Sequence, residues 1–297
     1  MSPPWPEPVG VGLSFLPDRL DLVAALVPGV DYVEMSPEVF AVPLDDGRTV
    51  FDTAAAGRAL DVVGGLPVVA HGLELSIGSA HGWHEPALDL LDEFLALRPV
   101  PWHSEHLNSL SITAADGTVV HLGLPMPLPF TAECADLVAG RADAVIRRYG
   151  LPFLLENSAN YLPDLPADPG WDEATFLGAL TGAGGCGLLL DLFNLWVNCV
   201  NHRLDFGDLV DRLPVDKVVE VHVAGGEERE GLLLDSHSAA VPDPVWEVLE
   251  VVAGRAPHLA GVTVEVLGLY ADRLGEDGIR AQLDTARSIW NRRCAKL

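Results

Sequence analysis

Short runs of apolar residues recur along the chain without strict alternation of apolar and polar positions. Such runs are typical of parallel β-strands that are covered on both faces. We predict strands at eight of them, of which the fourth is weak in composition: 9–15, 30–36, 66–72, 101–107, 151–157, 186–192, 217–225 and 261–268.

The segments between these runs carry apolar residues at three- and four-residue spacing, which indicates helices with one buried face. The predicted helices are 17–28, 52–65, 85–99, 132–150, 172–185, 205–213, 243–257 and 280–293. Alternation of strand and helix eight times over predicts an α/β fold, a single (β/α)8 TIM barrel over residues 1–297. An open doubly wound sheet is the alternative, but no Gly-x-Gly-x-x-Gly turn follows the first strand. The longest irregular stretches, 108–130 and 226–242, are expected to be loops over one face of the barrel.

Ionisable side chains stand at the carboxyl ends of six predicted strands. The carboxyl ends of barrel strands form one rim, where active sites of such barrels lie. The six residues, each at the end of a strand, are His71, His106, Glu156, Asp191, His222 and Glu265. Because independent loop caps have no reason to fall at strand ends, we interpret the set as one site. Glu34 ends the second strand and is expected to support this ring.

Three further side chains join the ring by local spacing. Asp235 and His237 are two residues apart and share a face if that segment is extended. Asn194 follows Asp191 by three residues, so both point inward only if the chain turns out of the strand after Asp191. Three other histidines, His81, His84 and His103, are expected to have structural roles, and His103 is expected to point away from His106.

The predicted rim gathers four carboxylates, those of Glu156, Asp191, Asp235 and Glu265. At a partly desolvated barrel mouth they would repel one another unless cations neutralise them. The strand ends carry no lysine or arginine for this purpose. With four imidazoles and one amide oxygen, the set offers more ligands than one ion accepts, so we predict two or three metal ions. The mixture of histidine with carboxylates favours iron, manganese, cobalt or zinc over calcium or magnesium.

Composition limits the partners of this chain. Its formal net charge of −25 argues against nucleic acid and against an anionic membrane surface. The chain has neither a signal-peptide pattern nor an apolar run long enough to span a bilayer, so a cytoplasmic protein is expected. The four cysteines are far apart, which indicates neither a zinc knuckle nor a disulfide framework. They are expected to be free and mostly buried.

Seven segments, in order along most of the chain, resemble a known family. They are DYVEMSPE, HGLELSIGS, SEHL, LLENSANYL, LLLDLFNLWVNCVNH, EVHVAG and DSHSAAVPDPVW. The family is that of the multinuclear non-haem iron-dependent oxidative enzymes, which have a xylose-isomerase-like barrel and include the iron enzyme of methanobactin biosynthesis. The resemblance implies a cluster of two or three iron ions. Its implied ligands are the nine residues already placed in the ring: His71, His106, Glu156, Asp191, Asn194, His222, Asp235, His237 and Glu265.

The resemblance also implies an activity, the oxidation of a residue in a ribosomally made precursor peptide. The modified residue is expected to be a cysteine whose thiolate binds one iron, while a neighbouring iron binds dioxygen and hydrogen is removed from the β-carbon. Asp191, Asn194 and Asp235 are the ligands to which we assign catalytic roles. A partner protein that recognises the leader peptide is expected as well.

Three departures from the family pattern leave these ligands in place but leave the substrate class open. Glu105 replaces an aspartate in SDHL, DSHS replaces DTHG, and Val266 and Leu267 replace an Arg-Asp pair after the last glutamate. Two other functions therefore stay open. One is a divalent-metal sugar isomerase or metal-dependent hydrolase, and the other is a non-catalytic accessory barrel that binds metal or peptide.

Overall fold

Eight parallel strands close into a barrel, as the sequence predicts. The computed structural model describes residues 4–45 and 48–295. Around the barrel the strand order is β1-β14-β11-β10-β9-β6-β5-β2. The strands are β1 (Gly10–Ser14), β2 (Tyr32–Met35), β5 (Val68–Gly72), β6 (His103–His106), β9 (Phe153–Glu156), β10 (Gly187–Asp191), β11 (Val218–Val223) and β14 (Gly261–Val264). All eight predicted strands are confirmed, including the compositionally weak fourth one.

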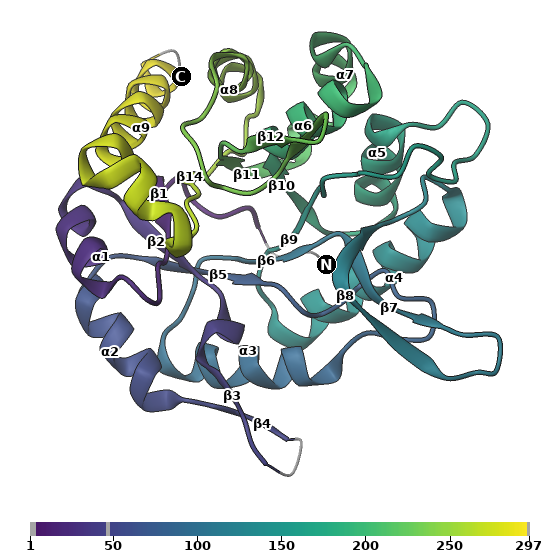
Figure 1. The fold of residues 1–297 in the computed structure, drawn as a ribbon, viewed down its shortest axis with the longest axis horizontal. Coiled ribbons are helices and arrows are strands. Elements are labelled where there is room, and N and C mark those ends of the chain that lie inside the picture. Colours follow the sequence, from purple (N-terminus) through teal and green to yellow (C-terminus); the bar gives the residue numbers. More distant parts are fainter. Residues whose placement is uncertain (1–3, 46–47, 296–297) are drawn as a thin grey trace.

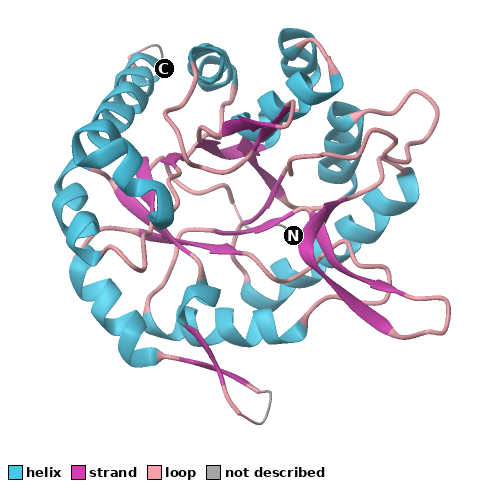
Figure 2. Ribbon diagram, in the orientation of Figure 1, coloured by secondary structure: helices cyan, strands magenta, loops and turns pink. Residues whose placement is uncertain are grey.

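Helices form a ring outside the strands (Figures 1 and 2). They are α1 (Leu20–Leu26), α2 (Thr53–Val63), α3 (Glu85–Leu97), α4 (Ala132–Tyr149), α5 (Glu173–Ala183), α6 (Leu192–His202), α7 (Phe206–Arg212), α8 (Asp243–Arg255) and α9 (Ala271–Cys294). Short 3₁₀ turns are η1 (Val27–Gly29), η2 (Pro37–Phe40), η3 (Val215–Lys217) and η4 (Gly268–Tyr270). No helix in the described ranges is both long and apolar enough to cross a membrane.

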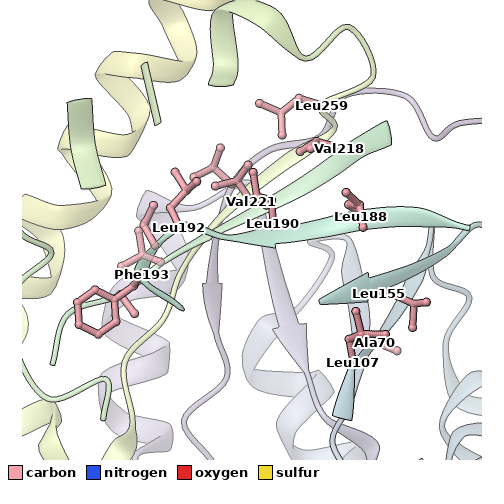
Figure 3. Close-up of a cluster of buried hydrophobic side chains, with 14 of the residues drawn as sticks. Ala70, Leu107, Leu155, Leu188, Leu190, Leu192, Phe193, Val218, Val221 and Leu259 are labelled. Carbon is pink, nitrogen blue, oxygen red and sulfur yellow. The ribbon is translucent and has the colours of Figure 1, made fainter. Parts of the chain in front are cut away.

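The main hydrophobic core lies between the strands and the helix ring. Alternate strand residues point outward into this layer, because successive side chains of a strand face opposite sides. Figure 3 shows Leu188 and Leu190 of β10 and Val221 of β11 in this layer, with Leu192 at the start of α6. The helix ring covers the outer face of the barrel, and apolar side chains also fill part of its inside. Strand residues are therefore buried on both faces, which explains the continuous apolar runs in the sequence.

A smaller cluster fills the inside of the barrel. It contains Tyr32, Val69, Trp102, Leu154, Leu189, Val219 and Ala260, with Trp5 and Val9 packed against it. The Tyr32 ring fits because Gly12 and Gly261 face it, and a Cβ at either would lie 2.5 Å from an atom of Tyr32. We call this layer the floor of the barrel. On β5, β9 and β10 the rim residue comes two positions after a floor residue of the same strand.

Two stretches expected to be loops contain β-hairpins. Residues 108–130 hold β7 (Asn108–Thr113) and β8 (Val119–Pro127), and residues 226–242 hold β12 (Glu227–Arg229) and β13 (Leu232–Leu234). A third hairpin joins β3 (Ala41–Pro43) to β4 (Thr49–Phe51). The hairpins β7–β8 and β3–β4 project from the helix ring (Figure 1). Their short strands lack a buried face, so the apolar pattern does not reveal them; the Asp-Gly pair at 116–117 was the available turn signal.

The helix α6 is absent from the predicted set. It begins directly at the end of β10, where the carboxylate of Asp191 accepts the backbone N–H of Asn194 at 2.6 Å. Most of its residues are buried, and its polar side chains, among them Asn194, Asn198 and His202, include no Asp, Glu, Lys or Arg, so it lacks the charged face typical of surface helices. This immediate turn from strand to helix meets the condition under which Asn194 and Asp191 point to the same site.

Candidate metal centre

The predicted ligands lie together at the carboxyl end of the barrel. In β5, β9 and β10 the apolar floor residue lies two positions before the rim residue: Val69 before His71, Leu154 before Glu156, and Leu189 before Asp191. Residues two apart on a strand share a face. The parallel register then aligns the rim residues of neighbouring strands, as in the pairing of His106 with Glu156.

Glu156 lies between three histidines. Its Oε2 is 3.2 Å from Nε2 of His71 and 3.1 Å from Nε2 of His106. Its Oε1 is 3.6 Å from Nδ1 of His222. With His71 and His106 it forms a group whose ligand atoms all lie within 4.8 Å of one another, close enough to hold a metal ion. Oε2 faces His71 and His106 while Oε1 faces His222, so the carboxylate of Glu156 can bridge two ions.

A second group is centred on His222. Its ligand atoms, from Glu156, Asp191, His222 and Glu265, also lie within 4.8 Å of one another. Nδ1 of His222 is 3.1 Å from Oε2 of Glu265. Asp191 and His222 are completely buried. Glu156 is therefore common to both groups, which places the two candidate ion positions side by side.

A third set comes from the segment after β13 and from α6. Nε2 of His237 is 2.7 Å from Oδ1 of Asp235 and 3.7 Å from Oε2 of Glu265. The extended backbone assumed for this pair is wrong, because His237 has a left-handed φ of 47°. The bend brings the two side chains together instead of setting them parallel. Asn194 contributes a buried Oδ1, since its Nδ2 donates to the carbonyl of Asn157.

Buried atoms without partners test whether these residues fit a metal. Seven of the predicted ligands have one: Glu156 Oε2, Asp191 Oδ2, Asn194 Oδ1, His222 Nδ1, Asp235 Oδ1, His237 Nε2 and Glu265 Oε2. Five of these atoms lie within 4 Å of an ion-pairing histidine or carboxylate, whereas Asp191 Oδ2 and Asn194 Oδ1 have neither kind of partner among the described residues. Buried polar atoms are nearly always hydrogen-bonded, and one left without any partner costs about 1–3 kcal/mol. All seven can offer a lone pair to a cation. The residues therefore fit a multinuclear metal centre.

Protons on histidines balance part of the negative charge in this structure. Burial lowers the pKa of His71, but the carboxylates of Glu34 and Glu156 outweigh it and raise that pKa to about 10. Burial acts in the opposite direction on Glu156, yet His106 and His71 hold its pKa well below the ordinary value. The charge on each member of this buried cluster thus depends on a neighbour of opposite charge.

The third set shows the same balance. Burial disfavours the charged form of His237, but Glu265 and Asp235 raise its pKa to about 10. Burial, followed by repulsion from Asp235 and Glu156, raises the pKa of Asp191 well above its ordinary value. The ion-pair partners of Glu156 and Glu265 in the described residues are all histidines. Histidines therefore favour the ionised forms of Glu156 and Glu265, whereas Asp191 beside them would need a metal cation to stay ionised as well.

Outer hydrogen bonds orient the imidazoles. Nε2 of His222 lies 2.9 Å from Oε2 of Glu34 and donates its hydrogen bond there. The lone pair of Nδ1 is then the one that can bind a metal ion. Nδ1 of His71 bonds Oγ of Ser104 at 2.9 Å. Nδ1 of His106 donates to the carbonyl of Gly72 at 3.1 Å. Such outer partners hold metal-binding histidines in one tautomer and one orientation. Glu34 occupies the supporting position expected for it.

Sequence reasoning missed Glu220, which is completely buried inside the barrel. It accepts hydrogen bonds from Tyr32 Oη at 2.9 Å, Trp102 Nε1 at 2.6 Å and Thr263 Oγ1 at 2.8 Å. Its position two residues before His222 on β11 was a sufficient signal, because both must face inward. Glu34, Glu220 and His222 form a third close group of ligand atoms. Since Glu220 already has three donors, we interpret it as structural support.

The other histidines lie elsewhere. His103 points away from the barrel axis, as expected, and packs against Tyr149 and Phe153. Burial lowers its pKa to about 3. His81 is exposed and bonds Oγ of Ser111. The four cysteines are free and mostly buried, as expected, with Cys294 exposed at the end of the last helix.

A cavity of about 490 Å³ opens above the candidate ligands. His71, His106, Asp235, His237 and Glu265 are among the residues that line it. Two other hollows in the described residues have volumes of only about 20 Å³ each, too small to hold a peptide side chain. The cavity therefore gives a substrate direct access to the candidate ligands.

Comparison with known proteins agrees with this geometry. The profile of a family described as RiPP precursor modification enzyme MbnB/TglH/ChrH matches residues 10–267. RiPPs are ribosomally synthesised and post-translationally modified peptides. This chain belongs to that family. The match runs from the start of β1 to the loop after β14, so it contains every predicted ligand.

Curated relatives match most of the length of the chain. A UPF0276 protein of Caulobacter vibrioides is 34% identical over 273 residues, covering 89% of this chain and 87% of the relative. A UPF0276 protein of Nitrosospira multiformis is 36% identical over 259 residues, covering 84% and 83%. Membership of a precursor-modifying family therefore rests on most of the barrel.

Solved structures show the same fold. A xylose isomerase domain protein of Alicyclobacillus acidocaldarius superposes with a TM-score of 0.52 at 18% identity, covering 95% of this chain and 99% of that one. The xylose isomerase-like protein of Rhodospirillum rubrum gives 0.51 at 17% identity, covering 96% and 98%. The xylose-isomerase-like barrel implied by the sequence resemblance is confirmed.

Proposed function

We propose that this family member is an iron-dependent, dioxygen-using enzyme that modifies a residue, by its resemblance a cysteine, in a ribosomally made precursor peptide. The single observation that carries the proposal is the set of seven buried ligand atoms without hydrogen-bond partners at one end of the barrel. Membership of a precursor-modifying family supplies the substrate class. The donor set of nitrogen and oxygen atoms, without a thiolate, suits iron in an oxidative enzyme.

The proposed ligands divide into three positions. His71, His106 and Glu156 would hold one ion, and Glu156 would share a second with Asp191, His222 and Glu265. The third position would use the remaining residues, Asn194, Asp235 and His237, beside Glu265. The proposal of two or three ions therefore follows from the carboxylates that these positions share. A form with two irons would leave empty the third position, that of Asn194, Asp235 and His237.

The chain's own residues have three tasks in this proposal. Bound iron would supply the redox chemistry and the positions at which substrate sulfur and dioxygen bind. The barrel strands hold Glu156 and His222 rigidly, and Glu34 fixes the free nitrogen of His222. The cavity above the site admits the peptide residue to be modified. Asp191, Asn194 and Asp235 keep their proposed catalytic role as ligands; of the three, Asp235 lines the cavity, and the other two are buried beneath it.

The experiment is anaerobic purification followed by addition of ferrous iron. Metal content is measured by plasma mass spectrometry, and cysteine-containing precursor peptides encoded beside the gene are then offered with and without dioxygen. We expect two or three iron ions per chain, oxygen consumption with the correct peptide, and a mass change in that peptide. A partner protein encoded nearby is tested in the same assay, because leader recognition is part of the proposal.

The alternatives give different results in the same assay. Tightly bound zinc, with hydrolysis or isomerisation and no oxygen consumption, indicates the hydrolase or isomerase. Bound iron with no turnover of any peptide, with or without the partner, indicates an accessory protein. Either result contradicts the proposed oxidation.

A further inference from the structure

Four large aliphatic side chains stand partly in solvent around the cavity above the candidate ligands. Val39, Leu73, Leu267 and Leu269, which we call the apolar lip, all line this cavity. Their exposed fractions are 38%, 36%, 48% and 82%. Exposed aliphatic residues scattered singly need no explanation, but several grouped on one cavity mark a binding surface.

The apolar lip is attached directly to the candidate centre. Leu73 comes two residues after His71, and Leu267 two residues after Glu265. The backbone N–H of Leu267 donates to the carbonyl of His237. A side chain held against the lip is therefore a near neighbour, along a peptide, of a residue held over the ligands.

The charged residues that line the cavity, apart from the candidate histidine ligands, are acids. Its described lining includes the acids Asp18, Glu34, Asp235 and Glu265 but neither lysine nor arginine. Arg19, next to Asp18 in the chain, is paired with Asp21 and Asp272. The groups that can offset these acids, His71, His237 and the proposed metal ions, lie at the candidate ligands. An acidic peptide residue held at the lip would therefore meet chiefly the exposed carboxylate of Asp18.

We propose that the apolar lip is the subsite for a large apolar side chain adjacent to the modified residue, and that the acidic cavity wall selects against a glutamate or aspartate there. The inference deepens the proposed function, on which it rests, by naming the substrate class as precursor peptides with an aliphatic or aromatic neighbour. The occupant is a peptide, because the lip continues the wall of the cavity that leads to the ligands. Leu267 of the lip stands where the family resemblance has the aspartate of an Arg-Asp pair, so this part of the preference belongs to this chain.

Binding of synthetic peptides tests the subsite without any oxidation. The probes are rhodamine-labelled hexapeptides, Lys-Gly-Leu-Cys-Gly-Lys and its versions with serine or glutamate in place of leucine. Fluorescence anisotropy is measured with the full-length protein as purified, under nitrogen. Because contact with a leucine side chain removes much of its apolar surface from water, we expect the leucine peptide to bind about tenfold more tightly than the serine peptide. The glutamate peptide is expected to bind more weakly still.

Variants connect this preference to the lip. The double variant Leu267→Ser with Leu269→Ser should reduce the difference between the leucine and serine peptides to about twofold. Leu97→Ser is the matched control, since Leu97 is 39% exposed at the far end of α3 and does not line the cavity. It should keep the full preference.

Equal binding of leucine and serine peptides by the unaltered protein, or full preference in the double variant, overturns the proposal. So does a dimer in light scattering that the double variant dissociates, because the lip would then be a contact between copies. The proposed function fails separately: a protein that prefers the leucine peptide but never oxidises any peptide keeps the subsite and loses the oxidation. A protein that oxidises peptides regardless of the neighbouring residue loses only the subsite.

Discussion

At the scale of single residues, Glu156 has the most constrained position in the candidate centre. Its two oxygens lie between 3.1 and 3.6 Å from ring nitrogens of three histidines on three other strands. Full burial in this place is tolerable only while positive charge surrounds the carboxylate. The same residue belongs to two of the close ligand groups, so it links the proposed ions as well as the strands.

Glu34 offers a test of how the outer residues act. Replacing it by glutamine (Glu34→Gln) removes the charged acceptor of the His222 Nε2 proton but keeps the size of the side chain. We expect metal affinity to fall by about 10- to 100-fold, the usual effect of removing such a partner. Competition with a metal-binding dye measures it.

The control for this variant is Glu247→Gln on the exposed face of α8. It should leave metal affinity unchanged. Unchanged affinity in Glu34→Gln as well would show that Glu34 does not orient His222.

At the scale of elements, the residue that caps α6 is also a candidate ligand. Asp191 ends β10, caps α6 through its Oδ1, and leaves its Oδ2 buried without a partner. Helix capping needs only a hydrogen-bond acceptor, whereas a metal ligand of this kind needs the carboxylate charge. The two roles can therefore be separated by substitution.

Asparagine and alanine should separate them. Asp191→Asn keeps an acceptor for the N–H of Asn194, so the metal-free variant should be at least as stable as the unaltered protein. Asp191→Ala loses the cap and should unfold with about 1 kcal/mol less free energy. Both variants should bind fewer metal ions. Urea denaturation of the metal-free proteins and metal analysis measure the two effects.

If the asparagine and alanine variants are equally stable, the cap contributes nothing to α6. If either one keeps the full metal content, Asp191 is not a ligand.

At the scale of the whole molecule, the metal-free protein depends on protonated histidines. The pKa values of His71 and His237 are raised to about 10 by neighbouring carboxylates, although burial opposes the charge. A raised histidine pKa stabilises the fold fully below the unfolded value of about 6.5, and this contribution is lost as pH rises through the folded value. The window for this loss is therefore pH 6.5 to about 10.

Thermal unfolding of the two forms should differ in this window. We expect the melting temperature of the metal-free protein to fall as pH rises from 6.5 to 10. The metal-loaded protein should change much less, because cations replace the protons in balancing the carboxylates. Differential scanning calorimetry of both forms measures the difference. A flat profile for the metal-free protein would contradict this description of the charge balance.

The comparison of sequence and structure separates local from long-range information. Apolar runs between helical segments sufficed to place all eight barrel strands. The ends of those runs also identified side chains such as Glu156 and Asp191, because period-two alternation and a common strand direction force them to one rim. These inferences use only neighbouring residues and the known closure of such barrels.

The hairpins, α6 and the bend at His237 were decided by tertiary structure. Strands β7 and β8 are specified by pairing across a turn. Neighbouring elements bury most residues of α6, including two of its asparagines, so its sequence carries no charged face. Burial of Glu220 is tolerable only because Tyr32, Trp102 and Thr263 donate hydrogen bonds to it. These donors are distant in the sequence, so the local pattern did not reveal the role of Glu220.

The sequence alone thus determined which elements form and which side chains reach the rim, because strand periodicity is a local property. Only the folded chain decided how those side chains divide into groups that share Glu156 and Glu265, and that four aliphatic residues surround the cavity above them. Distances of 3–4 Å between residues 28 to 85 positions apart depend on how the barrel closes, and no local pattern encodes that closure.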